Sequence, residues 1–354
     1  MPLSDLDIRP LDLRAASDHE SACFNGFENL MRAEVLPDDP PIPCSEETER
    51  NRAMPAFIQE GAWAVWDHGD RRLIAFAAVD ADYSGDNLHV ADFTIQVLPD
   101  FRCRGFAREL LRRIVPYARS HGRRLLIASS NERVPASAEF LARIGARKGL
   151  EAGENQLRLV DVDRGLLARW LEQAAELSQE FYLGVWEGPV PEERILGMIA
   201  LVQQLINDAP HDSLELEDST HVANTYRPFE AWEFAGGRRR WMMYAIHRPD
   251  DRVAGMTEVT WSPNRPGIIE QWGTGVWPAD RNRGLGRWLK AAMLTKILHE
   301  LPEARLIRTG NANSNAPMLK INWELGFKPF ISRPAWQVET ETVEKYLAGS
   351  LQAA

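Results

Sequence analysis

The order of apolar and polar positions predicts the same succession of elements in both halves of the chain. Strand-like runs cover residues 62–66, 73–79 and 88–97 in the first half, and residues 240–247, 253–261 and 268–276 in the second. Helical spacing of apolar residues follows each set, over residues 104–120 and 284–300. A short strand, a second helix and one or two closing strands complete each half. The fold class is therefore α/β (α+β), with a mixed, mostly antiparallel sheet flanked by helices in each half.

An internal repeat supports this division. Residues 97–110, VLPDFRCRGFAREL, and residues 276–289, VWPADRNRGLGRWL, share seven of fourteen positions at a constant offset, which pairs Val97 with Val276 and Leu110 with Leu289. We expect an N-terminal domain over residues 1–162, a linker helix over residues 163–180 and a C-terminal domain over residues 181–354. At roughly 100–200 residues per domain, the length of 354 residues fits two domains.

Composition narrows the class of partner. The net charge of −10 disfavours nucleic acid and is compatible with a cationic amine, although an acidic surface also simply promotes solubility. Three cysteines without CxxC spacing predict neither a disulfide framework nor a metal site. No apolar run approaches the roughly 18 residues of a membrane helix, and the first residues lack the pattern of a secretory signal. We therefore expect a cytoplasmic protein that binds no membrane.

The repeated motif, R-x-x-G-x-(G/A), lies between a strand and a helix. Glycine lets the backbone approach a ligand, and the first turn of a helix offers free N–H groups with partial positive charge. This arrangement predicts a cradle for a diphosphate, with a tight turn that binds nothing as the alternative. The chain has no GxxxxGK[ST] or GxGxxG segment, so a nucleoside triphosphate loop and a dinucleotide-binding loop are excluded.

The fuller pattern, V-x-P-x-x-R-x-R-G-x-(G/A), resembles the GNAT superfamily of acyl-CoA N-acyltransferases. Residues 311–327, from Asn311 through Asn322 to Leu325-Gly326-Phe327, resemble the family's segment after the fifth strand. The resemblance is closer over residues 181–340 than over residues 60–160, and the two-domain plan is similar to that of mycothiol synthases and other bacterial tandem acetyltransferases.

The resemblance implies acetyl-CoA as co-substrate and no metal. Backbone groups of the fourth strand would hold the pantetheine arm, the loop amides would hold the diphosphate, and two later asparagines would reach the pantetheine or the reacting centre. In the second half these residues are Thr274, Val276, Arg281, Asn282, Arg283, Gly284, Leu285, Gly286, Arg287, Asn311 and Asn315. The second possible site comprises Val97, Arg102, Arg104, Gly105, Phe106, Ala107 and Arg108. For the asparagines, loop and helix capping is the alternative.

The resemblance also suggests a base. Glu270 precedes Arg281 by the spacing that matches the catalytic glutamate of one branch of the family; a solvated glutamate on the strand is the alternative. The constant offset of the repeat places Ala91 at the equivalent position. We therefore expect the C-terminal domain to be catalytic and the N-terminal domain to be degenerate. Asn322 stands where the family has a tyrosine acid, so the acid is water or another tyrosine, Tyr226 or Tyr244.

Three functions remain open from the sequence. The preferred one is an acetyl-CoA-dependent N-acetyltransferase that acts on a primary amine of a small molecule by direct attack in a ternary complex. The others are acetylation of a cysteinyl conjugate, as in mycothiol synthase, and a non-catalytic acyl-CoA-binding or regulatory protein. A monomer and a homodimer are both compatible with the tandem plan.

Overall fold

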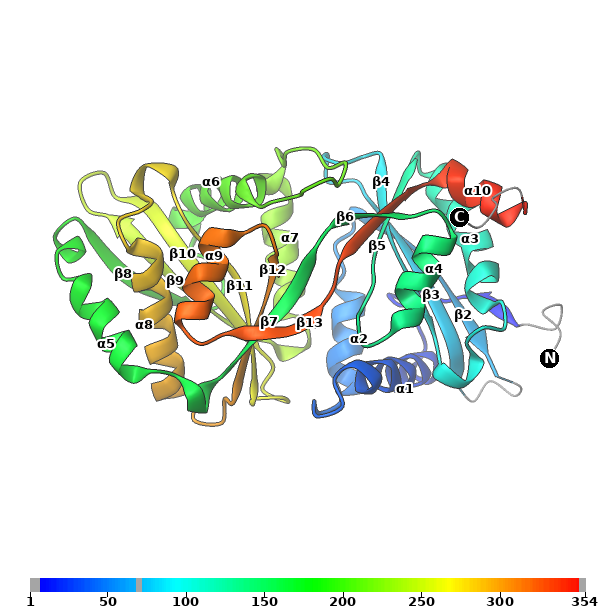
Figure 1. Ribbon diagram of the computed structural model, residues 1–354, viewed down its shortest axis with the longest axis horizontal. Helices are drawn as coiled ribbons and strands as arrows, with labels where there is room; N and C mark the ends of the chain where they lie inside the picture. The colour runs from blue at the N-terminus through cyan, green and yellow to red at the C-terminus, as the bar shows by residue number, and fades with distance from the viewer. Residues whose placement is uncertain (1–6, 68–71, 350–354) are drawn as a thin grey trace. The chain divides into compact units, whose positions relative to one another are not determined.

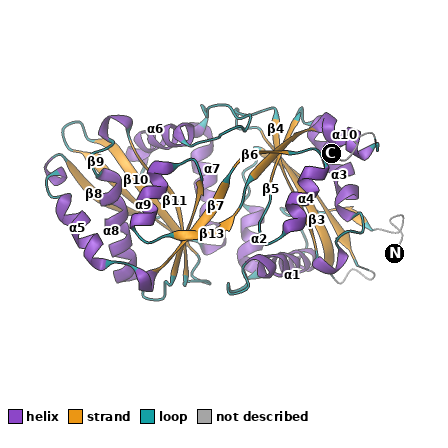
Figure 2. Cartoon of the chain, viewed as in Figure 1, coloured by secondary structure: helices purple, strands orange, loops and turns teal. Residues whose placement is uncertain are grey.

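The computed structural model describes residues 7–67 and 72–349, which divide into two units (Figure 1). Unit 1 comprises residues 1–151, 211–217 and 333–354, and unit 2 comprises residues 152–210 and 218–332. Within the described residues each unit contains one seven-stranded sheet, and helices cover both faces of each sheet (Figure 2). The predicted fold class, two mixed sheets flanked by helices, is confirmed.

Unit 1 has the strand order β1-β2-β3-β4-β5-β14-β6. Its strands are β1 (Ile8–Pro10), β2 (Ile58–Trp66), β3 (Leu73–Asp82), β4 (Val90–Val97), β5 (Leu125–Ser129), β6 (Arg147–Leu150) and β14 (Ala335–Glu339). Its helices are α1 (Asp18–Val35), α2 (Cys44–Arg52), α3 (Phe106–Ser120), α4 (Pro135–Arg143) and α10 (Thr340–Leu347). Helix α1 begins at a capping box in which Ser17 and Glu20 satisfy each other's backbone amides.

Unit 2 repeats this plan with the strand order β13-β7-β12-β11-β10-β9-β8. Its strands are β7 (Ala152–Arg158), β8 (Phe181–Glu187), β9 (Arg239–His247), β10 (Arg252–Trp261), β11 (Ile268–Val276), β12 (Leu306–Ala312) and β13 (Lys328–Ser332). Its helices are α5 (Arg164–Gln173), α6 (Glu192–Asp208), α7 (Val222–Phe234), α8 (Leu285–Glu300) and α9 (Ala316–Glu324).

The central strands of each unit are buried on both faces because helices pack on each side. In unit 1 the ring of Phe24 in α1 meets Phe76 of β3 edge to face on one side, while Leu110 and Ile114 of α3 are fully buried on the other. In unit 2 the α8 side buries Ile269 and Leu289, and the α6 side buries Met198. Such double burial explains the nearly continuous apolar runs that predicted these strands.

The two halves of the chain exchange one strand each. Strand β7 lies between β12 and β13 in unit 2, and β14 lies between β5 and β6 in unit 1, all as antiparallel neighbours. Only Glu151 separates β6 from β7, which is too short for a hairpin turn. Arg333 and Pro334 separate β13 from β14, and proline cannot adopt the positive φ that a type I′ turn requires. Each strand therefore continues into the other unit.

This exchange differs from the boundaries expected from the sequence. The chain passes from unit 1 to unit 2 at residue 151 rather than 162, returns for residues 211–217, and finally re-enters unit 1 at residue 333. The expected linker helix ends at Gln173, and it is part of unit 2, where Leu167 and Trp170 are buried in the core beside α8. Its apolar stripe was visible in the sequence, but the stripe did not reveal which core it joins.

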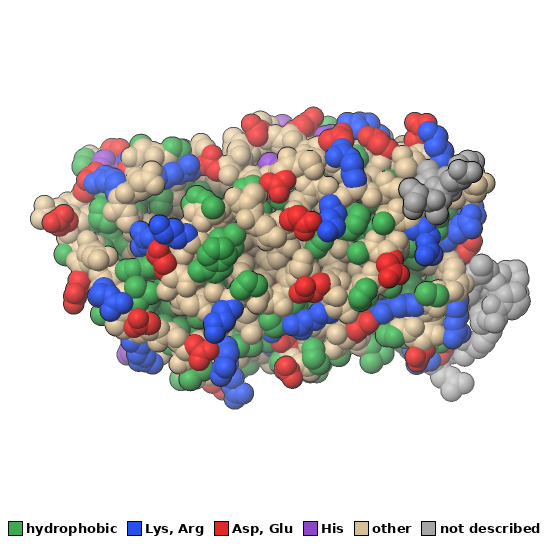
Figure 3. Space-filling view, viewed as in Figure 1, with side chains coloured by type: hydrophobic (Ala, Val, Ile, Leu, Met, Phe, Trp, Pro, Cys, Tyr) green, Lys and Arg blue, Asp and Glu red, His purple; other side chains and the backbone are tan. Residues whose placement is uncertain are grey.

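The surface is mixed in charge. On the face drawn in Figure 3, acidic and basic side chains are interspersed. Within the described part of the chain, no helix is both long and apolar enough to cross a membrane.

Candidate functional site

The two copies of the repeated motif adopt the same backbone conformation. A single turn of 3-10 helix, Pro99–Phe101 or Pro278–Asp280, ends each strand. The positions of Cys103 and Asn282 have φ of 58° and 61°, and those of Gly105 and Gly284 have φ of 89° and 97°. A left-handed residue just before a helix favours glycine, and any side chain at these positions is strained.

Both loops end in an open helix N-terminus. Gly105 and Gly284 are the N-cap residues of α3 and α8, and neither helix has a side-chain cap. The first intrahelical bond of α8 runs from the Trp288 amide to the Gly284 carbonyl. The amides of Leu285, Gly286 and Arg287 therefore have no partner within the helix, as in Phe106, Ala107 and Arg108 of α3, which is the geometry that binds an anion.

The first arginine of each motif braces the loop instead of facing this N-terminus. Arg281 Nε donates to the Val276 carbonyl at 3.0 Å, and Arg102 Nε donates to the Val97 carbonyl at 3.1 Å. The remaining guanidinium nitrogens form ion pairs with Asp208 at the end of α6 and with Glu34 near the end of α1. These two residues, predicted to bind the cofactor, thus hold strand end, loop and helix together.

The outer arginines differ between the units. Arg283 pairs with Glu180 at 2.8 Å, and this hydrogen bond lowers the pKa of Glu180 to about 2. Arg287 pairs with Glu324 at 2.9 Å. In unit 1, Arg108 donates to the Leu347 carbonyl, and Arg104 lies over the Phe101 ring, 5.3 Å from its centre, without a carboxylate partner among the described residues. The rim of unit 1 therefore keeps more uncompensated positive charge.

Beside each loop, two parallel strands open. Strand β11 pairs with β12 only over Ile268–Glu270 and Leu306–Arg308, although both strands continue. Strand β4 pairs with β5 only over Val90–Asp92 and Leu125–Ile127. Beyond these three pairs, backbone groups of β11 and β12 that face the opening lack a ladder partner and are available to an extended ligand arm. Thr274 and Val276 lie on this open part of β11.

A bulge distinguishes unit 2 from unit 1. The segment of β11 from Glu270 to Val276 is one residue longer than the segment of β10 that it pairs with, from Gly255 to Thr260, so β11 carries one extra residue near Trp272 and Gly273. The β3–β4 ladder is regular from Val97 to Asp92. Because of the bulge, side chains at alternate positions of β11 do not all lie on one face of the sheet. Glu270 and Trp272 lie on the α6 side, whereas the hydroxyl of Thr274 lies 2.7 Å from that of Thr257 on the α8 side.

The extra residue also corrects the sequence alignment. Asp92 is the third residue of β4 that pairs with β5, and Glu270 is the third residue of β11 that pairs with β12. For residues that precede the bulge, equivalent positions in the two units are therefore one residue closer in number than they are within the repeated motif. Ala91 is therefore not the counterpart of Glu270, and the conclusion that the first half lacks an acid at this position is wrong. A constant offset cannot reveal an insertion inside a strand.

The two equivalent acids have different surroundings. Glu270 accepts a hydrogen bond from the buried Arg238 at 2.6 Å, and Arg238 also pairs with Glu233. The Glu270 carboxylate is thus occupied by an ion pair with Arg238. Asp92 is reached by solvent and has no ion-pair partner among the described residues, while surrounding protein atoms and then Asp82 raise its pKa to about 6.

Asp92 ends a row of acids across unit 1. Glu60 of β2 is paired with Asp80 of β3, and Asp80 is paired with Asp92 of β4, so the three side chains share one face. Burial, followed by the charge of Glu60, raises the pKa of Asp80 to about 7. Glu28 of α1 faces the same side, and burial raises its pKa to about 7. Such a row favours a cationic ligand at this face.

In unit 2, Glu258 is a candidate base that was not predicted from the sequence. It is the single acid within β10, opposite the bulge and on the same side of the sheet as Glu270. Burial raises its pKa to about 7, and Arg240 lowers it in part. A lone glutamate within the apolar run of residues 253–261 was the available signal. The hydroxyl of Tyr226, one of the suggested acids, is buried without a hydrogen-bond partner in the part of the chain that the structure describes, and burial raises its pKa. Tyr244 stacks on Trp186.

The predicted asparagines have unequal roles. Asn315 caps α9 by accepting from the Met318 amide at 3.4 Å, as the capping alternative predicted. Asn311 lies on the open part of β12, and its side-chain oxygen accepts from Asn322 at 2.9 Å and from Asn155 at 3.4 Å. Asn322 in turn accepts from Lys290 at 2.9 Å.

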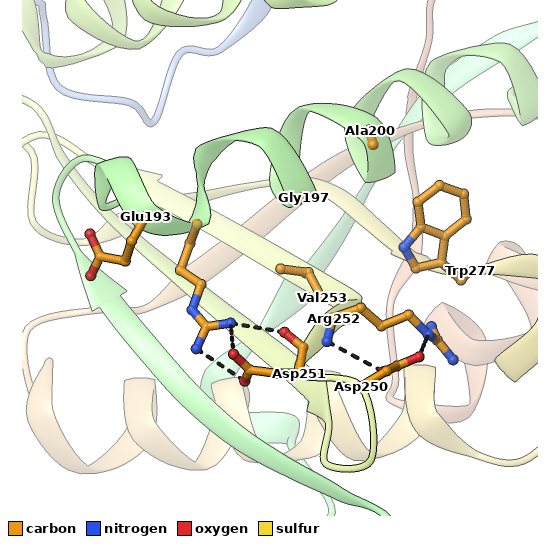
Figure 4. A pocket seen from close by; sticks show the side chains of 9 residues that line it. Glu193, Gly197, Ala200, Asp250, Asp251, Arg252, Val253 and Trp277 are labelled. Atoms are coloured by element: carbon orange, nitrogen blue, oxygen red, sulfur yellow. Dashed lines mark hydrogen bonds and ion pairs between the residues drawn. The ribbon is translucent and has the colours of Figure 1, made fainter.

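A separate hollow of about 400 Å³ lies beside α6 (Figure 4). Four of its five charged side chains pair with one another: Arg194 with Asp251 at 2.8 Å, and Arg252 with Asp250 at 3.1 Å. It therefore presents little unpaired charge to a ligand.

Among the described residues, no group of three or more His, Cys, Asp or Glu side chains is arranged to hold a metal ion.

Comparison with known proteins agrees with this geometry. The model of the Acetyltransferase (GNAT) family matches residues 30–146. A tandem GNAT protein from the clavulanic acid biosynthesis pathway, solved without acetyl-CoA, superposes with a TM-score of 0.77 and 25% identity, over 95% of this chain and 99% of that one. Residues 30–146 match the GNAT family, and the whole chain has the fold of a tandem GNAT protein. It is thus an acyltransferase of the N-acetyltransferase type.

Two further solved structures show the same fold. A GCN5-related N-acetyltransferase from Sphaerobacter thermophilus has a TM-score of 0.62 and 13% identity, over 95% of this chain and 96% of that one. A fungal GCN5-related glucosamine N-acetyltransferase region has a TM-score of 0.62 and 12% identity, over 94% of this chain and 38% of that one. No curated protein matches the sequence. The family match lies in unit 1, the half in which the sequence analysis found the looser resemblance.

Proposed function

We propose that this tandem GNAT protein transfers an acetyl group from acetyl-CoA to a primary amine of a small molecule by direct attack in a ternary complex. The observation that carries the proposal is the opening between β11 and β12 immediately beside the uncapped N-terminus of α8. The amides of residues 285–287 bind the diphosphate, and the free edge of β11 binds the pantetheine arm, so that the thioester reaches the bulge.

The bulge directs the reaction to the α6 side of the sheet, where Glu258 and Glu270 lie. The neutral amine attacks the thioester carbonyl carbon, the ammonium proton passes to a carboxylate, and the tetrahedral intermediate expels the thiolate of coenzyme A. Glu258 suits proton transfer better than Glu270 because its pKa of about 7 is close to neutral pH and it has no guanidinium partner as close as Arg238 is to Glu270. Glu270 then fixes Arg238 at the edge of the acceptor side.

A second candidate places the transfer in unit 1. Asp92 is open to solvent, has no ion-pair partner among the described residues, and ends an acidic row on the corresponding side of that sheet. In this case the acceptor is a compound with more than one positive charge, because several carboxylates with raised pKa values are stabilised together by a cation.

A coupled assay tests both candidates. Release of the coenzyme A thiol is measured with acetyl-CoA and a series of a monoamine, a diamine, a longer polyamine and a cysteinyl conjugate, and products are identified by mass spectrometry. Turnover with a simple amine supports the proposal. Turnover with the conjugate alone supports the mycothiol synthase-like alternative, and binding of acetyl-CoA without turnover of any acceptor supports a non-catalytic role.

A further inference from the structure

Unit 2 buries a lysine that the proposed chemistry does not use. Lys290 of α8 is 3% exposed, and its ammonium donates to the Asn322 side-chain oxygen at 2.9 Å. The ammonium lies over the ring of Phe327, 5.7 Å from its centre. Burial lowers the pKa of Lys290 to about 7. A lysine buried without a carboxylate destabilises a fold, so its presence calls for a compensating role.

The lysine begins a chain of side-chain amides. Asn322, which is fully buried, accepts from Lys290 through its oxygen and donates through Nδ2 to the oxygen of Asn311. Asn155 of the exchanged strand β7, which is 6% exposed, donates to the same oxygen of Asn311. Asn311 lies beyond Arg308, the last residue of β12 that pairs with β11.

These contacts fix the direction of each amide when Lys290 is protonated. A lysine ammonium has three donors and no acceptor, so it holds the oxygen of Asn322 toward itself and the NH₂ of Asn322 toward Asn311. With its oxygen occupied by two donors, Asn311 has only its NH₂ group left for a further partner. We propose that Lys290 orients this relay so that Asn311 presents an N–H donor to a carbonyl of the pantetheine arm in the opening between β11 and β12.

The relay rests on the proposed binding of acetyl-CoA in unit 2. Lys290 acts through two other side chains and is therefore a positioning residue. Replacement by methionine, which has nearly the same volume and no donor, removes the constraint on Asn322 and lets both amides flip. Because the unpaired charge disappears from the core, the variant is at least as resistant to urea as the wild type.

The test compares two ligands by calorimetry: acetyl-CoA, which has the pantetheine arm, and ADP, which has only the diphosphate and nucleoside. We expect Lys290→Met to weaken acetyl-CoA about tenfold, the effect of one hydrogen bond, and to leave ADP unchanged. Asn322→Asp is the second variant, since it keeps a partner for Lys290 but cannot donate to Asn311, and it gives the same selective loss even if Lys290→Met fails to fold.

Unchanged affinity for acetyl-CoA in both variants, or an equal loss for ADP and acetyl-CoA, overturns the relay. Failure of the proposed function looks different: the wild type then binds neither ligand, or its binding survives a glutamate at Gly284.

Discussion

Units 1 and 2 have the same loop between strand and helix but different strands beside it. The backbone of the two loops is closely similar at both left-handed positions, with φ of 58° and 61° at the first and 89° and 97° at the second. Both first arginines also brace the strand end in the same way. In contrast, β11 has a bulge and β4 has none. The loop conformation is thus the same in both copies of the repeat, whereas one inserted residue changes which side chains of the strand lie on each face of the sheet.

The acids follow the same contrast. In unit 1 the acidic side of the sheet carries a row of carboxylates with raised pKa values, while in unit 2 arginines interleave with the acids, as in the pairs Arg238–Glu270 and Arg240–Glu230. Similar loops therefore lie beside sheet faces that differ in charge. Which unit transfers the acetyl group depends on these surfaces rather than on the motif.

The largest effect is expected from separating the halves at the predicted boundary. A fragment of residues 1–162 lacks β14 between β5 and β6, and its own β7 cannot fold back across the single residue Glu151. We expect no cooperative urea transition by circular dichroism. A matched fragment with an Asn-Gly-containing turn inserted after Glu151 regains a transition. Cooperative unfolding of the unmodified fragment shows that the exchange is dispensable.

The next effect concerns the candidate bases. Glu258→Gln lowers kcat/KM by roughly 10²- to 10³-fold, because it removes the proton acceptor. In the wild type kcat/KM rises with pH through about 7, where Glu258 loses its proton, and this rise is absent in the variant. Glu270→Gln costs less than about tenfold. If Asp92→Asn instead abolishes turnover, and kcat/KM of the wild type rises near pH 6 rather than near pH 7, unit 1 is the unit that transfers the acetyl group.

The smallest effect is expected from the first arginine of each motif, and it distinguishes an arginine that stabilises the loop from one that binds the ligand. Arg102→Ala destabilises unit 1 by about 1–2 kcal/mol, because it loses a carbonyl hydrogen bond and a partly buried ion pair. Arg281→Ala costs about 0.5–1 kcal/mol, because its ion pair is more exposed. Urea midpoints measure both. If either variant keeps its stability but loses affinity for acetyl-CoA, that arginine contacts the ligand directly.

The sequence allowed the repeat, the order of elements and the two glycine turns before α3 and α8 to be predicted, because glycine, proline and apolar spacing act locally. It did not reveal the exchanged strands, although the one-residue link at Glu151 and the Arg333-Pro334 link were visible, because strand partners depend on the whole sheet. The repeat aligned Ala91, and not Asp92, with Glu270, because the extra residue of a bulge cannot be located from the composition of a strand. Lys290 was not predicted because its contacts depend on the packing of α8 against α9 and on Asn155, which belongs to a strand distant in the sequence.

Calorimetric titration of acetyl-CoA into Gly284→Glu and its matched control Gly105→Glu tests the central claim most directly. Both substitutions introduce the same strain and the same negative charge at a helix N-terminus, at φ of 97° and 89°. The account predicts that Gly284→Glu, still folded by circular dichroism, loses the acetyl-CoA site of unit 2 and the acetyl transfer, while Gly105→Glu keeps both. Wild-type binding and turnover in Gly284→Glu contradict it.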